Sequence, residues 1–140
     1  MKILIILLIA SGIGFASWGA EGESALFLSF GGKATIVAVV DDFMFGVLEN
    51  PRTKPYFLNV DQKKTKEHLS DFICVTMEGP CQYPGRTMKK AHSGLGISKG
   101  DYNALVEVLR TAMDKNNVPN RAQNKLLARL APMYREIIEK

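Results

Sequence analysis

Residues 83–98 read YPGRTMKKAHSGLGIS, and this stretch holds one of the two histidines of the 140-residue chain. Two glycines follow the histidine, His92, and close a short basic turn of helix. Met88 lies four residues before His92, so both side chains leave the same helix face, whereas the two lysines between them point elsewhere. An apolar side chain beside an imidazole, with cations at its flanks, suits a flat apolar ring that bears carboxylates at one edge.

Haem is a ring of this kind, and a neutral imidazole is the commonest protein ligand of its iron. We therefore predict that His92 is an iron ligand. The same residues also allow the commoner role of a single histidine near a helix end, which is that of a helix cap or a surface residue.

A series of short motifs surrounds this stretch. They are, in chain order, Phe30-Gly31-Gly32, Val40-Asp41-Asp42-Phe43 with Val47-Leu48, Pro55-Tyr56-Phe57 with Val60-Asp61, His68 with Phe72, Tyr83-x-Gly85-x-x-Met88-x-x-x-His92, Gly94-x-Gly96-Ile97, Val118-Pro119 and Ala131-Pro132. In order and spacing they resemble the motifs of a group I truncated haemoglobin. The resemblance runs from about residue 25 to residue 138 and needs no gap between the second helix and His92.

This resemblance implies an all-α fold, the truncated globin's two-over-two helical sandwich, with haem b held between the helix of residues 61–77 and His92. A bound haem would also supply the apolar surface that the glycine- and proline-rich segment of residues 77–98 cannot bury by itself. The implied contacts are Phe57 packed against the ring, Met88 near its proximal face, and Arg86 or Lys89 at a propionate.

On the distal side the chain departs from the family pattern. The tyrosine usual at position 44 is Met44, and the glutamine usual at position 69 is Leu69. Thr65 remains as the only short hydroxyl on that helix face, which also carries Phe72. Bound oxygen carries partial negative charge, and a hydrogen bond to a charged group is worth about 1.5–3 kcal/mol. We therefore expect faster oxygen release by roughly one to two powers of ten.

His68 has two roles open to it. Some cyanobacterial members of the resembled family use a histidine at the matching position as a sixth iron ligand. The alternative is a half-exposed histidine beside Glu67 and Asp71. If His68 binds, the iron is bis-histidyl whenever no gas is present.

The apolar pattern is helical throughout and lacks the alternation of strands. Apolar residues recur at helical spacing in residues 36–47, a helix that Glu49-Asn50-Pro51 ends, and in residues 65–76, after the N-cap Asp61. A third helix, residues 102–113, follows Ser98-x-x-Asp101, which has the form of a capping box. The last helix, residues 126–138, contains Pro132 as an expected kink.

The chain opens with Lys2 and an apolar run from Ile3 to Ala10, which is too short and too soon broken by glycine for a bilayer span of about twenty residues. Small residues at 16–20 offer a cleavage site. We therefore expect a signal peptide at residues 1–20, a globin domain at residues 21–140, and export to the periplasm or the extracellular space. Membrane contact would come only through the signal segment, and an uncleaved anchor is the alternative.

Cys74 and Cys81 are the only cysteines, and no C-x-x-C-H motif for covalent haem attachment is present. Export would allow a disulfide between them. Two free thiols, one of them buried, are the alternative that the sequence leaves open.

Three functions are consistent with these features. The leading one is an exported haem protein that reversibly binds O2 or another diatomic gas, NO or CO. The second is a bis-histidyl electron carrier or redox enzyme acting on nitric oxide or peroxide, with an electron-donor protein as partner. The third is a small helical interaction domain without haem. The formal charge of +4 becomes +3 without Lys2, and this mild excess argues against a nucleic-acid partner.

Overall fold

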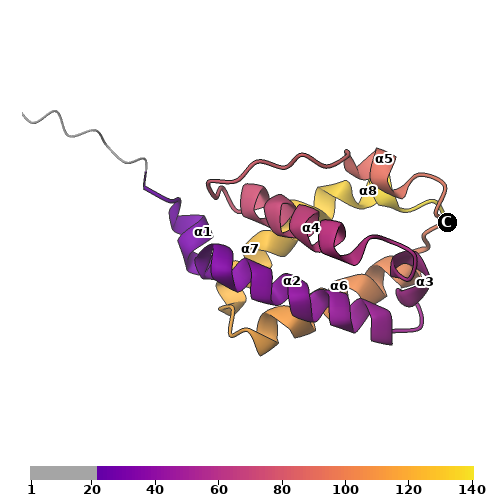
Figure 1. The fold of residues 1–140 in the computed structure, drawn as a ribbon, viewed down its shortest axis with the longest axis horizontal. Coiled ribbons are helices and arrows are strands. Elements are labelled where there is room, and N and C mark those ends of the chain that lie inside the picture. Colours follow the sequence, from indigo (N-terminus) through magenta and orange to yellow (C-terminus); the bar gives the residue numbers. More distant parts are fainter. Residues whose placement is uncertain (1–21) are drawn as a thin grey trace, which may run out of the picture.

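The computed structural model describes residues 22–140, so the predicted signal peptide and its boundary lie outside the described residues. The described part is helical (Figure 1). Its elements are α1 (Ala25–Phe30), α2 (Gly32–Glu49), α3 (Lys54–Phe57), α4 (Gln62–Thr76), α5 (Met88–His92), α6 (Lys99–Lys115), α7 (Asn120–Leu130), the 3-10 helix η1 (Ala131–Met133) and α8 (Tyr134–Ile137). Within residues 22–140 no helix is both long and apolar enough to cross a membrane.

The first two helices meet at a sharp corner. Gly31 ends α1 with φ of 112°, in the left-handed region, and α2 begins at the next residue. A side chain at Gly31 would also collide with Thr35, so this corner depends on glycine. The Phe30-Gly31-Gly32 motif therefore sets the angle between the two helices.

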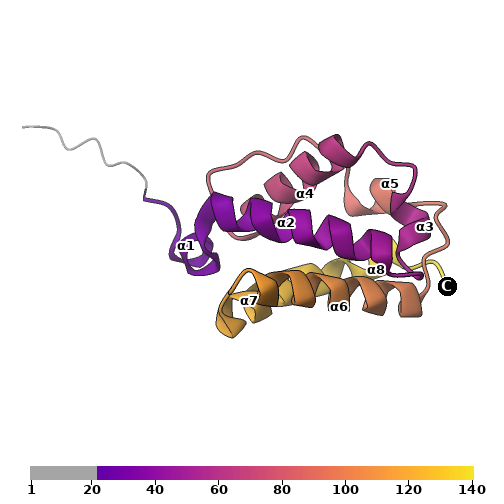
Figure 2. The ribbon, with the colours of Figure 1, turned by 60° about the horizontal axis from the view of Figure 1, so that its bottom comes forward.

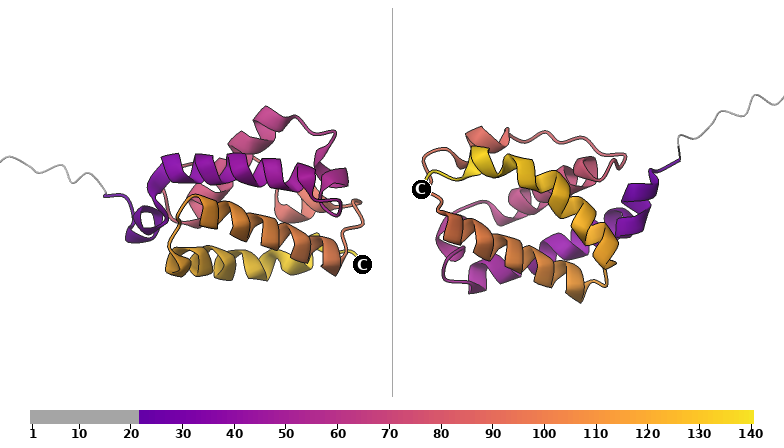
Figure 3. Two further views of the ribbon diagram at one scale, coloured as in Figure 1. Left: turned by 90° about the horizontal axis from the view of Figure 1, so that it is seen from below. Right: turned by 180° about the vertical axis from the view of Figure 1, so that it is seen from behind.

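α2 carries the centre of the core. Its buried residues include the whole apolar series predicted between residues 36 and 47, together with Met44. α2 packs against α4 on one side and α6 on the other. Figures 2 and 3 show α2 and α4 in one layer over α6, α7 and α8 in the second.

The predicted helix boundaries are confirmed where capping residues set them. Asp61 accepts a hydrogen bond from the Lys64 amide at the start of α4, and Ser98 and Asp101 form a complete capping box at the start of α6. Pro132 falls in η1, which separates α7 from α8. Proline has no N–H to continue the helical ladder, so the α-helical hydrogen bonding gives way to a 3-10 turn at the position of the expected kink.

The segment between α4 and α5 runs back along α4 without regular structure (Figure 1). A disulfide between Cys74 and Cys81 ties its first part to α4, with 5.9 Å between the two Cα atoms. Cys74 is fully buried. Of the two alternatives left open by the sequence, the structure contains the disulfide.

Candidate functional site

His92 is the last residue of α5, a helix of five residues that begins after the N-cap Thr87. The Nδ1 atom of its ring lies 2.7 Å from the carbonyl oxygen of Met88. A carbonyl oxygen only accepts hydrogen bonds, so in the neutral ring Nδ1 carries the proton and Nε2 keeps its lone pair. This is the arrangement in which a histidine is oriented by one ring nitrogen and offers the other to a metal.

The larger apolar side chains of the short helices α3, α5 and α8 are half buried. α3, α5 and α8 have no buried residue. In α6 the buried residues are confined to its second half. These elements and the first half of α6 lie at one end of the molecule, the end that holds the C-terminus (Figure 1). The half-buried residues of these elements and of the chain just after α8 include Phe57, Met88, Leu105, Val106, Ile137 and Ile138, and Leu69 and Phe72 on α4 are half buried as well.

The contrast with the core indicates where an apolar ligand fits. Side chains of α1, α2, α4 and α7 and of the second half of α6 form a core in which most are under 6% exposed. Phe57, Leu69 and Leu105 pack against the edge of this core but are not covered by it. The chain alone therefore leaves apolar surface on the His92 side that a flat apolar ring would cover.

α4 shows the same division between its two faces. Its buried residues are Ser70, Ile73 and Cys74. Of the predicted stripe only Ile73 is among them, and Thr65, Leu69 and Phe72 are half buried. Most of the stripe therefore lies beside the face of α4 that packs on α2, where it is free to meet a ligand.

The distal positions singled out in the sequence lie in apolar surroundings. Met44 is 1% exposed and belongs to the core, and Leu69 packs against that core. Neither side chain has a donor group. Phe57 lies edge-on to Phe43, with ring centroids 6.1 Å apart. Among these positions the Thr65 hydroxyl is the one donor, and it is half buried.

His68, on α4, lies against an aromatic pair. Its ring centroid is 6.2 Å from that of Tyr83, which also contacts Phe72 edge-on at 5.3 Å. The Tyr83 hydroxyl donates to the Arg86 carbonyl at 2.8 Å. Two residues before Tyr83, the disulfide at Cys81 fixes the chain to Cys74 of α4. This role of Tyr83 was not predictable from the sequence, because nothing in the spacing shows that the irregular segment folds back onto α4.

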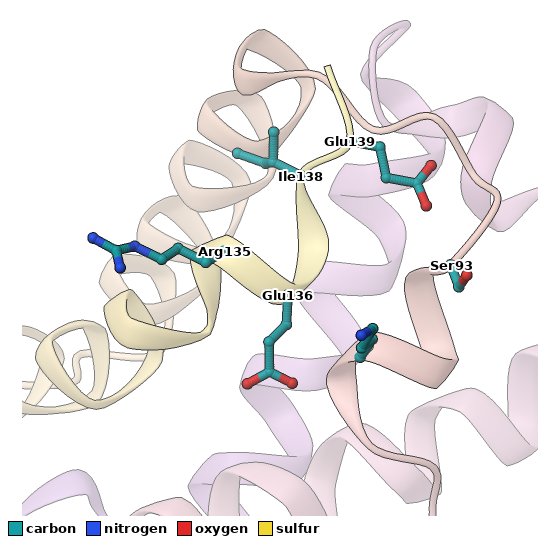
Figure 4. A pocket seen from close by; sticks show the side chains of 6 residues that line it. Ser93, Arg135, Glu136, Ile138 and Glu139 are labelled. Carbon is teal, nitrogen blue, oxygen red and sulfur yellow. The ribbon is translucent and has the colours of Figure 1, made fainter.

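The cations predicted to meet the propionates, Arg86 and Lys89, are exposed. Lys89 lines a surface pocket of about 310 Å³ between α5 and the end of the chain, with Ser93, Arg135, Glu136, Ile138 and Glu139 (Figure 4). The arrangement leaves both cations free to move toward an anionic group.

A polar network joins α3 to the start of α6. Hydrogen bonds from the Ser98 hydroxyl, the Ser98 amide and the Tyr56 hydroxyl, with Arg52 nearby, lower the pKa of Asp101 to about 2. Burial and the bond to Asp101 raise the pKa of Tyr56. The network ties the helix that carries Phe57 to the end of the loop that follows His92.

In residues 22–140 no group of three or more His, Cys, Asp or Glu side chains is placed to hold a metal ion. His68 lies on α4 and His92 on α5. The donor set at His92 is a single imidazole, which suits an iron whose other ligands come from a porphyrin.

Comparisons with known proteins agree with this arrangement. The sequence profile of the bacterial-like globin family matches residues 25–139. The group 1 truncated hemoglobin of Nostoc sp. (strain MUN 8820) is 32% identical over 117 residues, which span 84% of this chain and 99% of the relative. The group 1 truncated hemoglobin of Synechocystis sp. is 31% identical over 100 residues, which span 69% of this chain and 81% of the relative.

Solved structures show the same fold. The truncated hemoglobin of Tetrahymena pyriformis in its Fe(III) form has a TM-score of 0.78 at 24% identity, covering 82% of this chain and 98% of that one. The 2/2 hemoglobin from Synechococcus sp., in the cyanomet state with covalently attached heme, has a TM-score of 0.71 at 27% identity, covering 77% and 91%. The predicted two-over-two sandwich is confirmed, and haem is the cofactor of this family. The chain belongs to the bacterial-like globins, in their group 1 truncated form.

Proposed function

We propose that this globin binds haem b through Nε2 of His92 and uses the opposite face of the iron to bind O2 or a related diatomic gas reversibly. Globins bind haem and diatomic gases, and the finer assignment rests on one observation. The Met88 carbonyl oxygen accepts a hydrogen bond from the Nδ1–H group of His92, and this leaves Nε2 as the ligating nitrogen.

The half-buried apolar residues form the rest of the proposed haem site. Phe57, Leu69 and Phe72 would cover the ring from the α3 and α4 side, and Met88 from the α5 side. Covering these side chains adds apolar burial at about 25 cal/mol per Å², so the haem contributes to folding as well as to function. Arg86 and Lys89 are the cations for the propionates.

An apolar distal side favours fast release of gas. Haem iron supplies the gas-binding chemistry, and the chain sets how tightly a bound polar gas is held. Met44 and Leu69 cannot donate hydrogen bonds, which leaves Thr65 as the single candidate donor. We propose reversible gas binding or sensing, since tight oxygen storage and efficient nitric oxide dioxygenation both rely on distal donors.

The contacts of His68 favour an open sixth coordination site. Its ring packs against Tyr83, which in turn packs on Phe72. Coordination by His68, and with it the electron-carrier or peroxide-linked redox role, would require the ring to leave this contact. A haem-free interaction domain gains no support, because the chain is a globin.

We also propose that residues 1–20 are a signal peptide and that the protein works in the periplasm or outside the cell. The disulfide between Cys74 and Cys81 supports this proposal, since disulfides persist mainly in oxidising compartments. Fractionation of expressing cells, with N-terminal sequencing of the mature protein, tests it. A cytosolic protein that retains Met1 would refute it.

The gas-binding proposal is tested by titrating the reduced, haem-containing protein with CO and with O2 while recording absorption spectra. We expect a high-spin ferrous spectrum that converts to a low-spin spectrum with each gas and returns when the gas is removed. A ferrous spectrum that is already low-spin, and that CO changes only slowly, would instead support the bis-histidyl alternative.

A further inference from the structure

The loop after His92 presents two backbone amides to one carboxylate. Gly94 and Gly96 both have positive φ, 79° and 64°, which turns their N–H groups toward the same point. The Gly94 amide donates to Oε1 of Glu139 and the Gly96 amide to Oε2, each at 2.6 Å. The Glu139 carboxylate lies within the curve of the loop that runs on from Ser93 (Figure 4).

The backbone near Glu139 holds the same loop from a second side. The amide of Glu139 donates to the Ile97 carbonyl at 2.9 Å, and the amide of Lys140 donates to the same oxygen at 3.3 Å. Ile97 is 7% exposed. Glu139 therefore fixes the loop at both of its glycines and, with Lys140, at its last buried residue.

This attachment lies close to the proposed iron ligand. The Leu95 amide donates to the His92 carbonyl at 3.3 Å, so the turn held by Glu139 begins at His92 itself. α5 has no buried residue and packs chiefly on α8. With so little apolar burial, the direction of this five-residue helix depends on the polar contacts at its end.

We propose that Glu139 is a positioning residue for His92. The Glu139 carboxylate clamps Gly94 and Gly96 and so holds the His92 imidazole in the orientation that binds haem iron. This inference rests on the proposed role of His92. The hydrogen bonds from Gly94 and Gly96 lower the pKa of Glu139, so the carboxylate is charged and accepts from both amides at neutral pH.

The test compares Glu139→Ala and Glu139→Gln with Glu136→Ala in the haem-containing protein. Glu136 is a matched control because it is an exposed carboxylate of α8 that lines the same pocket. Two readouts are taken, which are the rate of haem transfer to an excess of apomyoglobin and the iron–histidine stretching band in the resonance Raman spectrum of the ferrous protein.

We expect Glu139→Ala to speed haem loss at least about tenfold, because it removes two hydrogen bonds to a charged group, and to shift or broaden the iron–histidine band. Glu139→Gln should lose haem at a rate between those of the wild type and Glu139→Ala, since the glutamine amide retains one accepting oxygen. Glu136→Ala should match the wild type. The same rate of haem loss and the same iron–histidine band in Glu139→Ala and Glu136→Ala would overturn the proposal that Glu139 positions His92. A wild-type protein without an iron–histidine band would instead overturn the assignment of His92, and the clamp with it.

Discussion

The Tyr56 hydroxyl donates a 3.0 Å hydrogen bond to Oδ2 of Asp101, and the same oxygen accepts from the Ser98 hydroxyl at 2.7 Å. Tyr56 precedes Phe57 in the chain, and Ser98 ends the loop that begins after His92. One carboxylate thus joins the helix expected to pack on the ring to the loop of the expected iron ligand. Together with the Glu139 clamp, it fixes that loop at both ends.

Asp101→Asn should lower the melting temperature at pH 7, and its difference from the wild type should shrink as the pH falls toward 2. The pKa of Asp101 is lowered in the folded state to about 2 from 3.8. Its stabilisation is therefore present above about pH 4 and is lost as the pH falls through the folded value. Thermal melts of variant and wild type from pH 7 to pH 2 measure the difference. Glu107→Gln, at an exposed carboxylate on α6, is the control. A difference in melting temperature as large at pH 2 as at pH 7 would show that the Asp101 charge is not its cause.

The double variant Met44→Tyr with Leu69→Gln should slow oxygen dissociation by roughly ten- to a hundredfold, because it restores two distal donors. Met44→Phe with Leu69→Met is the matched control, since it has nearly the same shape without the polar groups. Stopped-flow release of oxygen into a CO-saturated buffer gives the rates. The same rate in both double variants would mean that distal donors do not set affinity in this protein.

Tyr83→Ala should release His68 from its aromatic contact and give the ferric protein a low-spin fraction by coordination of the freed imidazole. The fraction should shrink as the pH falls, because only the neutral ring binds iron. Adding His68→Leu should abolish it. His68→Leu alone should leave a high-spin wild-type spectrum unchanged. A wild-type spectrum that is low-spin and becomes high-spin with His68→Leu would show that His68 already binds.

Removal of the disulfide by Cys74→Ala with Cys81→Ala should lower the free energy of unfolding by about 2–3 kcal/mol, the loop-closure value for two cysteines seven residues apart. Urea unfolding of the haem-containing protein measures it. The wild type should lose similar stability in reductant, whereas the double variant should not respond. Equal stability of wild type and variant in oxidising buffer would remove the structural role of this bond.

The parts of the fold that local chemistry determines were predictable from the sequence. The spacing of apolar residues in α2, the N-cap Asp61 and the capping box of Ser98 and Asp101 each depend on residues within one helix. The predicted helices at these positions are confirmed. The core-facing side of α4, with Ser70 and Cys74, was not predictable, because a helix beside a large cofactor has two apolar sides and periodicity does not distinguish the core side from the ligand side.

Contacts between distant segments were not predictable in the same way. Glu139 meets Gly94 across 45 residues, and Tyr56 meets Asp101 across the same number. Single charged or aromatic residues at such separations leave no periodic signal. Tyr83 was recognised as part of a family motif, but its contact with His68 depends on the return path of an irregular segment that the disulfide fixes.

The most direct test of the central assignment is the haem content of His92→Ala, measured as the Soret absorption per chain after expression and purification beside the wild type. His68→Ala is the matched control, because it removes the other histidine. The proposed site predicts that His92→Ala loses stable haem and its Soret band while His68→Ala keeps both, since α5 holds no other imidazole. Full haem content and an unchanged spectrum in His92→Ala would contradict it.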